Sequence, residues 1–325
     1  MNMERKAPGA GAAEYSRPLI VFTRADLVRF APTDWLVERW LVKNSLAGLV
    51  GPSGAGKSFL ALDWACRVAA GQRWLGNAVQ RGGVFYLAGE GQQGLRKRIA
   101  AWERHHGIPM DNKPLFLADN LPFLTDDSQA AGTVAAIEGM ADEIFFNCGG
   151  AEPVLVVIDT VARAMAGANE NSAEDMGRLI GNMDWLRTRF GACVLAIHHT
   201  GHAESDRARG SSAFRAALDS EFLLKPKDSS IVLATTKNKD WERPTPITLE
   251  KRIVPVEILG PDGEPLRDSS LILQPDTEAD VLAAKRAQVY RLRKDGLTLR
   301  DIAEELGVPK STVERWAKES DDGGF

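Results

Sequence analysis

The sequence contains few cysteines for its length. Cys66, Cys148 and Cys193 are the only three among 325 residues, and they are widely spaced and outside any Cys-x-x-Cys pattern. This usage argues against a disulfide framework and indicates reduced thiols.

The sequence also lacks long apolar runs. No run approaches the ~20 apolar residues that a membrane span needs. The N-terminal stretch MNMERKAPGAGAAEYSRP has no continuous apolar segment of the kind found in signal peptides. We therefore expect no membrane association and a cytoplasmic location, and we expect residues 1–34 to form a flexible arm.

Neither sign of charge is in large excess. The chain has 40 Lys and Arg against 44 Asp and Glu, a formal net charge of -4. Any affinity for nucleic acid must therefore come from local basic patches and not from the field of the whole molecule.

Short apolar runs alternate with amphipathic stretches over most of the chain. The runs at 46–50, 83–89, 114–119, 154–159 and 192–199 are typical of strands covered on both faces, with helices between them. This pattern predicts an α/β fold with a mostly parallel sheet. Residues 231–274 are strand-like segments separated by Pro, Gly and Asp turns, which predicts antiparallel hairpins, and the chain is expected to be helical from Thr277 onward.

The segment GPSGAGKS fits the G-x-x-x-x-G-K-[ST] pattern of a phosphate-binding loop, or P-loop. It lies between a predicted strand and a predicted helix, which is the context this pattern requires. Its backbone N–H groups would wrap the β-phosphate of ATP, the Lys57 side chain would reach the β- and γ-phosphates, and the Ser58 hydroxyl would bind Mg²⁺. The predicted nucleotide-binding residues are Gly51, Pro52, Ser53, Gly54, Ala55, Gly56, Lys57, Ser58 and Phe59.

Two carboxylates follow predicted strands. Asp159 ends the apolar run PVLVVID, where a carboxylate would lie beside the metal, so Ser58 and Asp159 are the predicted Mg²⁺ ligands. Glu90 follows the strand at 83–89 and would polarise the attacking water. A solvated loop glutamate is the alternative for Glu90.

The segment AIHHTGH contains His198, His199 and His202, three of the five histidines. Adjacent side chains of a strand face opposite ways, so His198 and His199 are poorly placed to bind one metal ion together. A strand end in a parallel sheet points toward the ligand crevice. From the residues alone, a structural histidine pair and a metal site are two interpretations of this segment.

These motifs together resemble the RecA/DnaB superfamily of ring or filament ATPases. The nearest likeness is to plasmid RepA-type hexameric helicases and related AAA_25-type ATPases, over residues of about 35 to 250. The resemblance implies a RecA-like P-loop NTPase core, ATP with Mg²⁺, a homo-hexameric ring and single-stranded DNA passing through that ring. It also implies that the strand end at His198 and His199 senses the γ-phosphate, with His199 as the catalytic residue. We favour this sensor role over a structural histidine pair and over a metal site.

The resemblance also assigns cations outside the P-loop. Lys237 and Lys239 match a lysine pair that reaches the neighbouring subunit's ATP, although a solvated hairpin edge is the alternative. Arg215 is a weaker candidate for the same role. Arg207 and Arg209 lie in a polar segment that in such proteins faces the DNA, so they are candidates for phosphate contacts, with a plain surface loop as the alternative.

The C-terminal residues predict a helix-turn-helix that binds duplex DNA. Thr298 is expected to cap a first helix, Gly307 to form the turn, and Ser311 with Glu314 to form a capping box for the second helix. Residues 285–318 contain nine basic and five acidic residues, a local excess of positive charge. The candidate DNA contacts are Lys310, Thr312, Arg315 and Lys318, and a protein-binding module is the alternative.

The expected organisation is a core at residues 35–275 and a helix-turn-helix at 276–325. Two functions fit it. One is an ATP-driven DNA helicase or translocase for plasmid or phage-type replication, with Lys57, Glu90, Asp159, His199, Lys237 and Lys239 in catalysis. The other is an ATP-regulated DNA-binding switch with slow hydrolysis.

Overall fold

The structure, a computed structural model, describes residues 24, 32–89, 92–200, 212–227, 230–259, 265–275, 285–286, 288–289, 292–293 and 296–322. Nearly all of the expected flexible arm, residues 1–34, lies outside this description.

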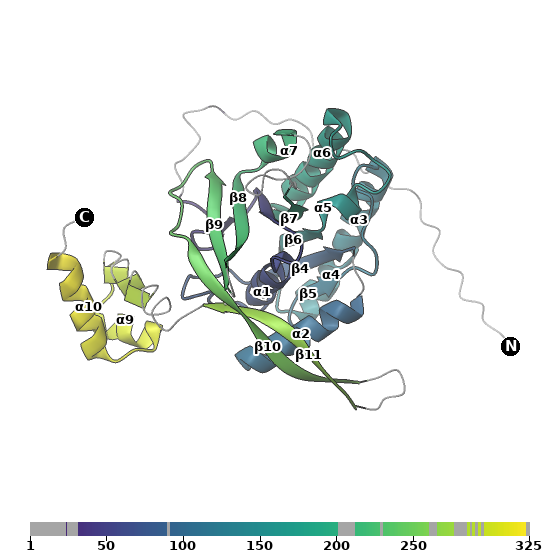
Figure 1. Cartoon of the computed structure of the whole chain (residues 1–325). Coiled ribbons are helices and arrows are strands. Elements are labelled where there is room, and N and C mark those ends of the chain that lie inside the picture. Colours follow the sequence, from purple (N-terminus) through teal and green to yellow (C-terminus); the bar gives the residue numbers. More distant parts are fainter. Residues whose placement is uncertain are drawn as a thin grey trace. The chain divides into compact units, whose positions relative to one another are not determined.

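A nine-stranded sheet forms the centre of the fold (Figure 1). Its strand order is β11-β10-β9-β8-β3-β7-β6-β4-β5. The six strands from β8 to β5 in this order are parallel, and β9, β10 and β11 extend the sheet by antiparallel pairing. The parallel strands are β3 (Leu46–Gly51), β4 (Gly83–Ala88), β5 (Leu115–Leu117), β6 (Pro153–Asp159), β7 (Cys193–His199) and β8 (Ser220–Lys227). The antiparallel strands are β9 (Ser230–Asn238), β10 (Ile247–Leu259) and β11 (Pro265–Pro275).

Two hydrophobic layers cover the parallel strands because alternate strand residues face opposite sides. One layer contains α1 (Lys57–Ala70) and α2 (Gln92–His106), packed on residues such as Leu155 and Leu195. The other contains residues of five helices, packed on residues such as Val156 and Val194. These helices are α3 (Asp127–Gly139), α4 (Ala141–Asn147), α5 (Val161–Ala164), α6 (Ala173–Phe190) and α7 (Ser212–Ala217). The predicted α/β fold with a mostly parallel sheet is confirmed.

An aromatic cluster fills the first layer beside α1. Trp40, Trp64, Trp74 and Phe222 are buried, with ring centroids 5.2 to 6.4 Å apart in the contacting pairs. Trp40 follows β1 (Trp35–Val37), which pairs with β2 (Leu41–Val42) in a small antiparallel hairpin that the sequence pattern did not predict.

The segment after residue 212 is not a single helix. The sequence AFRAALDSEFLL is amphipathic with helical periodicity, but α7 ends at Ala217 and β8 begins at Ser220. Two local features explain the break. The Asp219 carboxylate accepts a hydrogen bond from the backbone N–H of Leu46 at 2.8 Å, and the apolar residues that follow pair with β3 in the buried sheet. Burial on both faces outweighs helical periodicity here.

The described C-terminal part contains α9 (Leu299–Leu306) and α10 (Lys310–Asp322), and its described residues 285–286, 288–289 and 292–293 are also helical. Ile302, Leu306, Val313, Trp316 and Ala317 make up most of its small core. None of the described helices is both long and apolar enough to cross a membrane. The three cysteines are free and buried, as expected from their spacing.

Candidate nucleotide site and DNA-binding module

The C-terminal ends of adjacent parallel strands bring the predicted nucleotide-site residues together. Gly51 at the end of β3 lies opposite His199 at the end of β7, and Asp159 at the end of β6 lies opposite Ile197 of β7. Backbone hydrogen bonds continue just past these ends, from Thr200 N to Gly51 O at 3.1 Å and from Gly89 N to Asp159 O at 2.7 Å. This edge of a parallel sheet is where ligands of α/β proteins bind.

The loop between β3 and α1 has the backbone of a phosphate cradle. Gly54 and Gly56 have φ values of 75° and 91°, a region that glycine enters at no steric cost. Helix α1 begins at Lys57, so the free N–H groups of its first turn face this loop. At Gly51, an added Cβ would lie 2.6 Å from the carbonyl oxygen of Leu224, so a side chain there would push β3 away from β8.

Lys57 is buried against its own loop. Its ammonium donates to the carbonyl oxygens of Gly51 at 2.9 Å and Pro52 at 2.8 Å, and it lies 3.2 Å from Nδ1 of His199. Burial lowers the pKa of Lys57 from 10.5 to about 8, although the Asp159 carboxylate opposes this shift. The charged Lys57 ammonium is therefore partly desolvated, and an anion bound beside it would stabilise its charged form.

Asp159 is buried beside a tyrosine. The Tyr86 hydroxyl donates to Asp159 Oδ2 at 2.7 Å and to the carbonyl oxygen of Ser58 at 3.5 Å. Burial and the Asp159 charge raise the pKa of Tyr86 well above its usual value, which keeps the hydroxyl a donor. The Tyr86 hydroxyl thus holds the Asp159 carboxylate beside the backbone of Ser58. The Ser58 hydroxyl and the Asp159 carboxylate supply the oxygen atoms that Mg²⁺ prefers. The residues present fit this ion.

The two adjacent histidines face different layers. His199 approaches Lys57 on the α1 side, whereas His198 is fully buried and its ring lies 5.2 Å from that of Phe214 in α7, at 75°. This is the alternation expected for a strand. Among the described residues, no group of three His, Cys, Asp or Glu side chains is arranged to hold a metal. His202 lies outside the described residues.

Lys237 and Lys239 lie at the opposite end of the sheet from the P-loop. Lys237 donates to the carbonyl oxygens of Arg215 at 2.7 Å and Ala216 at 2.9 Å, at the end of α7. Lys239 forms an ion pair with Asp219 at 2.8 Å. Burial and the charge of Lys239 lower the pKa of Lys237, while Asp219 and Glu221 oppose the shift. Two close lysines repel each other unless an anion lies beside them. Here the chain supplies that anion, the Asp219 carboxylate.

Arg215 is also engaged within the chain. Its guanidinium Nε lies 2.9 Å from Glu221 Oε1, and Glu221 is fully buried. The same carboxylate oxygen accepts from the Thr236 hydroxyl at 2.6 Å. These contacts join α7, β8 and β9 at the edge of the sheet that carries the lysine pair.

The C-terminal helices have the geometry of a helix-turn-helix. Thr298 caps α9 by accepting from the Asp301 N–H at 3.3 Å, and Gly307 ends the helix with a φ of 60°, both as predicted. The predicted capping box is wrong: α10 begins at Lys310, so Ser311 lies inside its first turn. The carbonyl oxygen of Pro309 accepts from Thr312 and Val313 instead, because proline's fixed φ suits a helix start.

The candidate DNA contacts of α10 differ in exposure. Lys310 and Arg315 are exposed and Thr312 is half-buried. Lys310 also lies 3.5 Å from Glu314, one turn further along the helix. The side chain of Lys318 lies outside the described residues.

Comparison with protein families gives two matches. Residues 12–205 match the AAA_25 family, described as an AAA domain, and residues 280–325 match a homeodomain-like domain of the HTH_23 family. The first match covers more than half of the chain and includes the P-loop, Asp159 and the His198–His199 strand end.

The chain belongs to the AAA_25 family. It therefore carries a P-loop ATPase domain of the RecA-like superfamily, followed by a homeodomain-like helix-turn-helix. The AAA_25 match begins inside the segment expected to be a flexible arm, so that segment contains residues of the family domain.

Three predicted site residues of this AAA_25 protein lie outside the described residues: Glu90, Arg207 and Arg209. The structure therefore gives no position for them. The remaining residues of the predicted nucleotide site, from Gly51 to Phe59 with Asp159 and His199, lie along one edge of the sheet.

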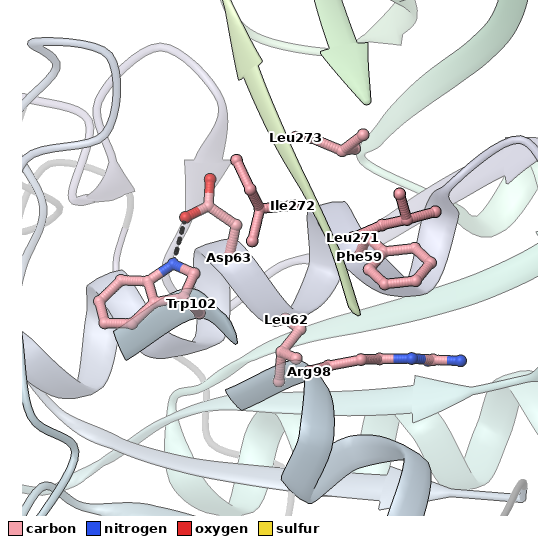
Figure 2. A pocket seen from close by; sticks show the side chains of 8 residues that line it. All are labelled: Phe59, Leu62, Asp63, Arg98, Trp102, Leu271, Ile272 and Leu273. Carbon is pink, nitrogen blue, oxygen red and sulfur yellow. Dashed lines mark hydrogen bonds between the residues drawn. The ribbon is translucent and has the colours of Figure 1, made fainter. Parts of the chain in front are cut away.

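A small cavity beside the P-loop helix contains residues that sequence reasoning missed. Figure 2 shows it between α1, α2 and β11, with Phe59, Asp63, Arg98 and Trp102 among its lining residues. The Arg98 guanidinium lies over the Phe59 ring, 4.7 Å from its centroid. No sequence motif identifies Arg98 or Tyr86. Arg98 of α2 contacts Phe59 and Tyr86 of β4 contacts Asp159, and both contacts depend on how these elements pack.

Asp63 is the polar centre of this region. Its two carboxylate oxygens accept from the indole N–H groups of Trp102 and Trp74, both at 2.7 Å, and Arg67 lies 3.3 Å away (Figure 2 shows the Trp102 bond). The carboxylate thus ties α2 and the turn at Trp74 to the P-loop helix.

Proposed function

We propose that this AAA_25 protein is an ATP-driven DNA translocase that works as a ring helicase in replication of plasmid or phage type. The observation that carries the proposal is the contact between Lys57 and His199. It joins the phosphate-binding cation to the end of the strand that leads into residues 201–211, the segment with the candidate DNA contacts Arg207 and Arg209.

In this proposal, phosphoryl transfer takes place at the edge of the sheet formed by Gly51, Asp159 and His199. Backbone N–H groups of the P-loop and Lys57 bind the phosphates, and Ser58 and Asp159 hold Mg²⁺, which neutralises charge on the phosphates. Tyr86 fixes the orientation of Asp159 by its hydrogen bond. Glu90 is proposed to orient the attacking water, and His199 to sense the γ-phosphate.

The position of the lysine pair supports action on another subunit's ATP. Lys239 binds Asp219, and Asp219 binds the N–H of Leu46, which is the first residue of β3. The P-loop follows the other end of β3, roughly 16 Å away at the usual rise per residue. Lys239 is therefore too far to serve the P-loop of its own chain, and a hexameric ring would bring it to a neighbour's.

The helix-turn-helix is proposed to bind duplex DNA, with Lys310, Thr312, Arg315 and Lys318 toward the DNA. Repetition of a small module around a ring would supply the avidity that one copy lacks. The division into a core at 35–275 and a DNA-binding module at 276–325, and a cytoplasmic location, complete the proposal.

A second function is supported by the same module. An ATP-regulated switch that binds one duplex sequence would need the helix-turn-helix and the P-loop, but not the lysine pair or DNA-stimulated turnover.

ATP hydrolysis measured with and without single-stranded DNA, across a protein titration, separates the two. The ring motor predicts stimulation by single strands that rises with assembly, followed by unwinding of a forked duplex. Turnover that ignores single strands, together with ATP-dependent binding to one duplex sequence, would favour the switch. Lys57→Ala is the inactive control in both cases.

A further inference from the structure

The antiparallel extension of the sheet reaches the P-loop. Gly56 lies against side chains of β9 and β11: a Cβ built there would meet Ile231 Cδ1 at 3.1 Å and Leu273 Cδ1 at 3.5 Å. Lys251 of β10 lies directly opposite Leu273 in the β10–β11 register. The hairpin is therefore held at a fixed position beside the loop.

From this position Lys251 contacts the loop itself. Its ammonium donates to the carbonyl oxygen of Gly54 at 3.3 Å. Gly54 and Ser53 are exposed, and no heavy atom lies within 4 Å of a Cβ built on Gly54, so little else packs against the tip.

The Gly54 carbonyl and the Ala55 N–H belong to one planar trans peptide, so they point in opposite directions. The Ala55 N–H points toward the carbonyl oxygen of Pro52 at 3.3 Å, the same oxygen that accepts from Lys57 at 2.8 Å. The inner side of the peptide is thus the side where the Lys57 ammonium lies, and the outer side is where Lys251 binds.

We propose that Lys251 is a positioning residue of the P-loop. It holds the Gly54 carbonyl outward and so keeps the Ala55 N–H on the inner side of the loop, beside the Lys57 ammonium that is proposed to bind the phosphates. Without this bond the peptide is free to rotate and to present a carbonyl oxygen to the phosphates, which repels them. This inference rests on the proposed ATP-binding site but not on helicase action.

The neighbouring arginine provides a matched control. Arg252 is the next residue on β10, and adjacent strand residues face opposite ways. Burial, and after it the charge of Arg252, lowers the pKa of His105 in α2, and the Arg252 guanidinium lies 3.4 Å from Gln274. Arg252 therefore lies on the same strand as Lys251 and is likewise exposed and positively charged, but its side chain faces away from the loop.

The test compares Lys251→Met, Lys251→Arg and Arg252→Met in the full-length protein. MgATP and MgADP affinities are measured by calorimetric titration, and kcat and KM by ATP hydrolysis. Lys251→Met is expected to weaken binding of both nucleotides about fivefold to tenfold, as loss of one ordinary solvent-exposed hydrogen bond does, with kcat within about twofold. Lys251→Arg is expected to restore most of the affinity, and Arg252→Met to bind as the wild type does.

Three outcomes would overturn the inference. These are unchanged affinity and KM in Lys251→Met, an equal loss in Arg252→Met, or an affinity in Lys251→Arg that is no higher than in Lys251→Met. Failure of the wild type itself to bind MgATP would instead contradict the proposed function.

Discussion

The Lys57 ammonium lies 3.2 Å from Nδ1 of His199, although 142 positions separate the two residues in sequence. When Lys57 is charged it must donate in this contact, so Nδ1 of His199 is then the acceptor and carries no proton. A residue at the end of β7 is thus in direct contact with the cation that is proposed to bind the phosphates.

The lowered pKa of Lys57 predicts a pH dependence of nucleotide binding. Below a pKa of about 8 the ammonium is charged and attracts phosphate, and above it the free protein loses this charge. KM for ATP is therefore expected to rise by up to about tenfold per pH unit above that pKa, with kcat less affected because bound phosphates favour the charged form. Steady-state kinetics between about pH 6.5 and 9.5 would check this. Lys57→Arg, which stays charged, should show no such rise if it retains turnover, and a flat KM in the wild type would contradict the assignment.

Lys57→Ala is expected to abolish ATP turnover, by about a thousandfold or more, because the β- and γ-phosphates lose their buried cation. Lys227→Ala, which removes an exposed lysine at the end of β8, is the control and should hydrolyse ATP as the wild type does. If Lys57→Ala hydrolysed ATP nearly as fast as the control, the phosphates would have to bind somewhere other than beside Lys57.

Lys239→Ala is expected to leave ATP binding intact but to lower turnover only in the assembled state, because this lysine lies at the far end of β3 from its own P-loop. Turnover per chain, measured across a protein titration, would rise for the wild type and stay low for the variant. The same turnover as the wild type at every concentration would remove the idea of a lysine acting on a neighbour.

Asp63→Ala is expected to lower the free energy of unfolding by about 3–5 kcal/mol, because two buried indole N–H groups and a partly buried arginine lose one shared acceptor. Urea unfolding measures this. Asp126→Ala, which removes the exposed N-cap of α3, should cost much less than Asp63→Ala. Equal losses in the two variants would contradict the role given to Asp63.

Arg315→Ala is expected to weaken binding to duplex DNA by about tenfold, since Arg315 is exposed on the second helix of the helix-turn-helix. Fluorescence anisotropy with a labelled duplex would measure the loss. Arg267→Ala, the same change at an exposed position of β11, should leave duplex affinity unaltered.

Sequence patterns predicted the parts of this structure that depend on neighbours along the chain. The strand ends at Asp159 and His199 were located by apolar runs that stop at polar residues, and the glycines of the P-loop by their spacing. The contacts of Tyr86 and Lys251 were not predictable in this way. They depend on which strands pair and in what register, and no local pattern encodes that.

Local and tertiary preferences also conflicted at two positions. The run after Ala217 has helical periodicity, but pairing with β3 and the Asp219 bond to Leu46 make it a strand. At the start of α10 the Ser311 pattern suggested a cap, while Pro309 already supplies the carbonyl that begins the helix. In both cases a structural partner outweighs a short sequence motif.

The aromatic cluster beside α1 has a spectroscopic consequence. Trp64 lies on the P-loop helix, and it contacts Trp40 and Trp74, while Asp63 of the same helix holds the indoles of Trp74 and Trp102. Indole emission responds to hydrogen bonding and to nearby charge, and closely spaced indoles exchange excitation energy. Four of the eight tryptophans therefore surround the P-loop helix, which gives the protein an optical reporter beside its proposed nucleotide site without any label.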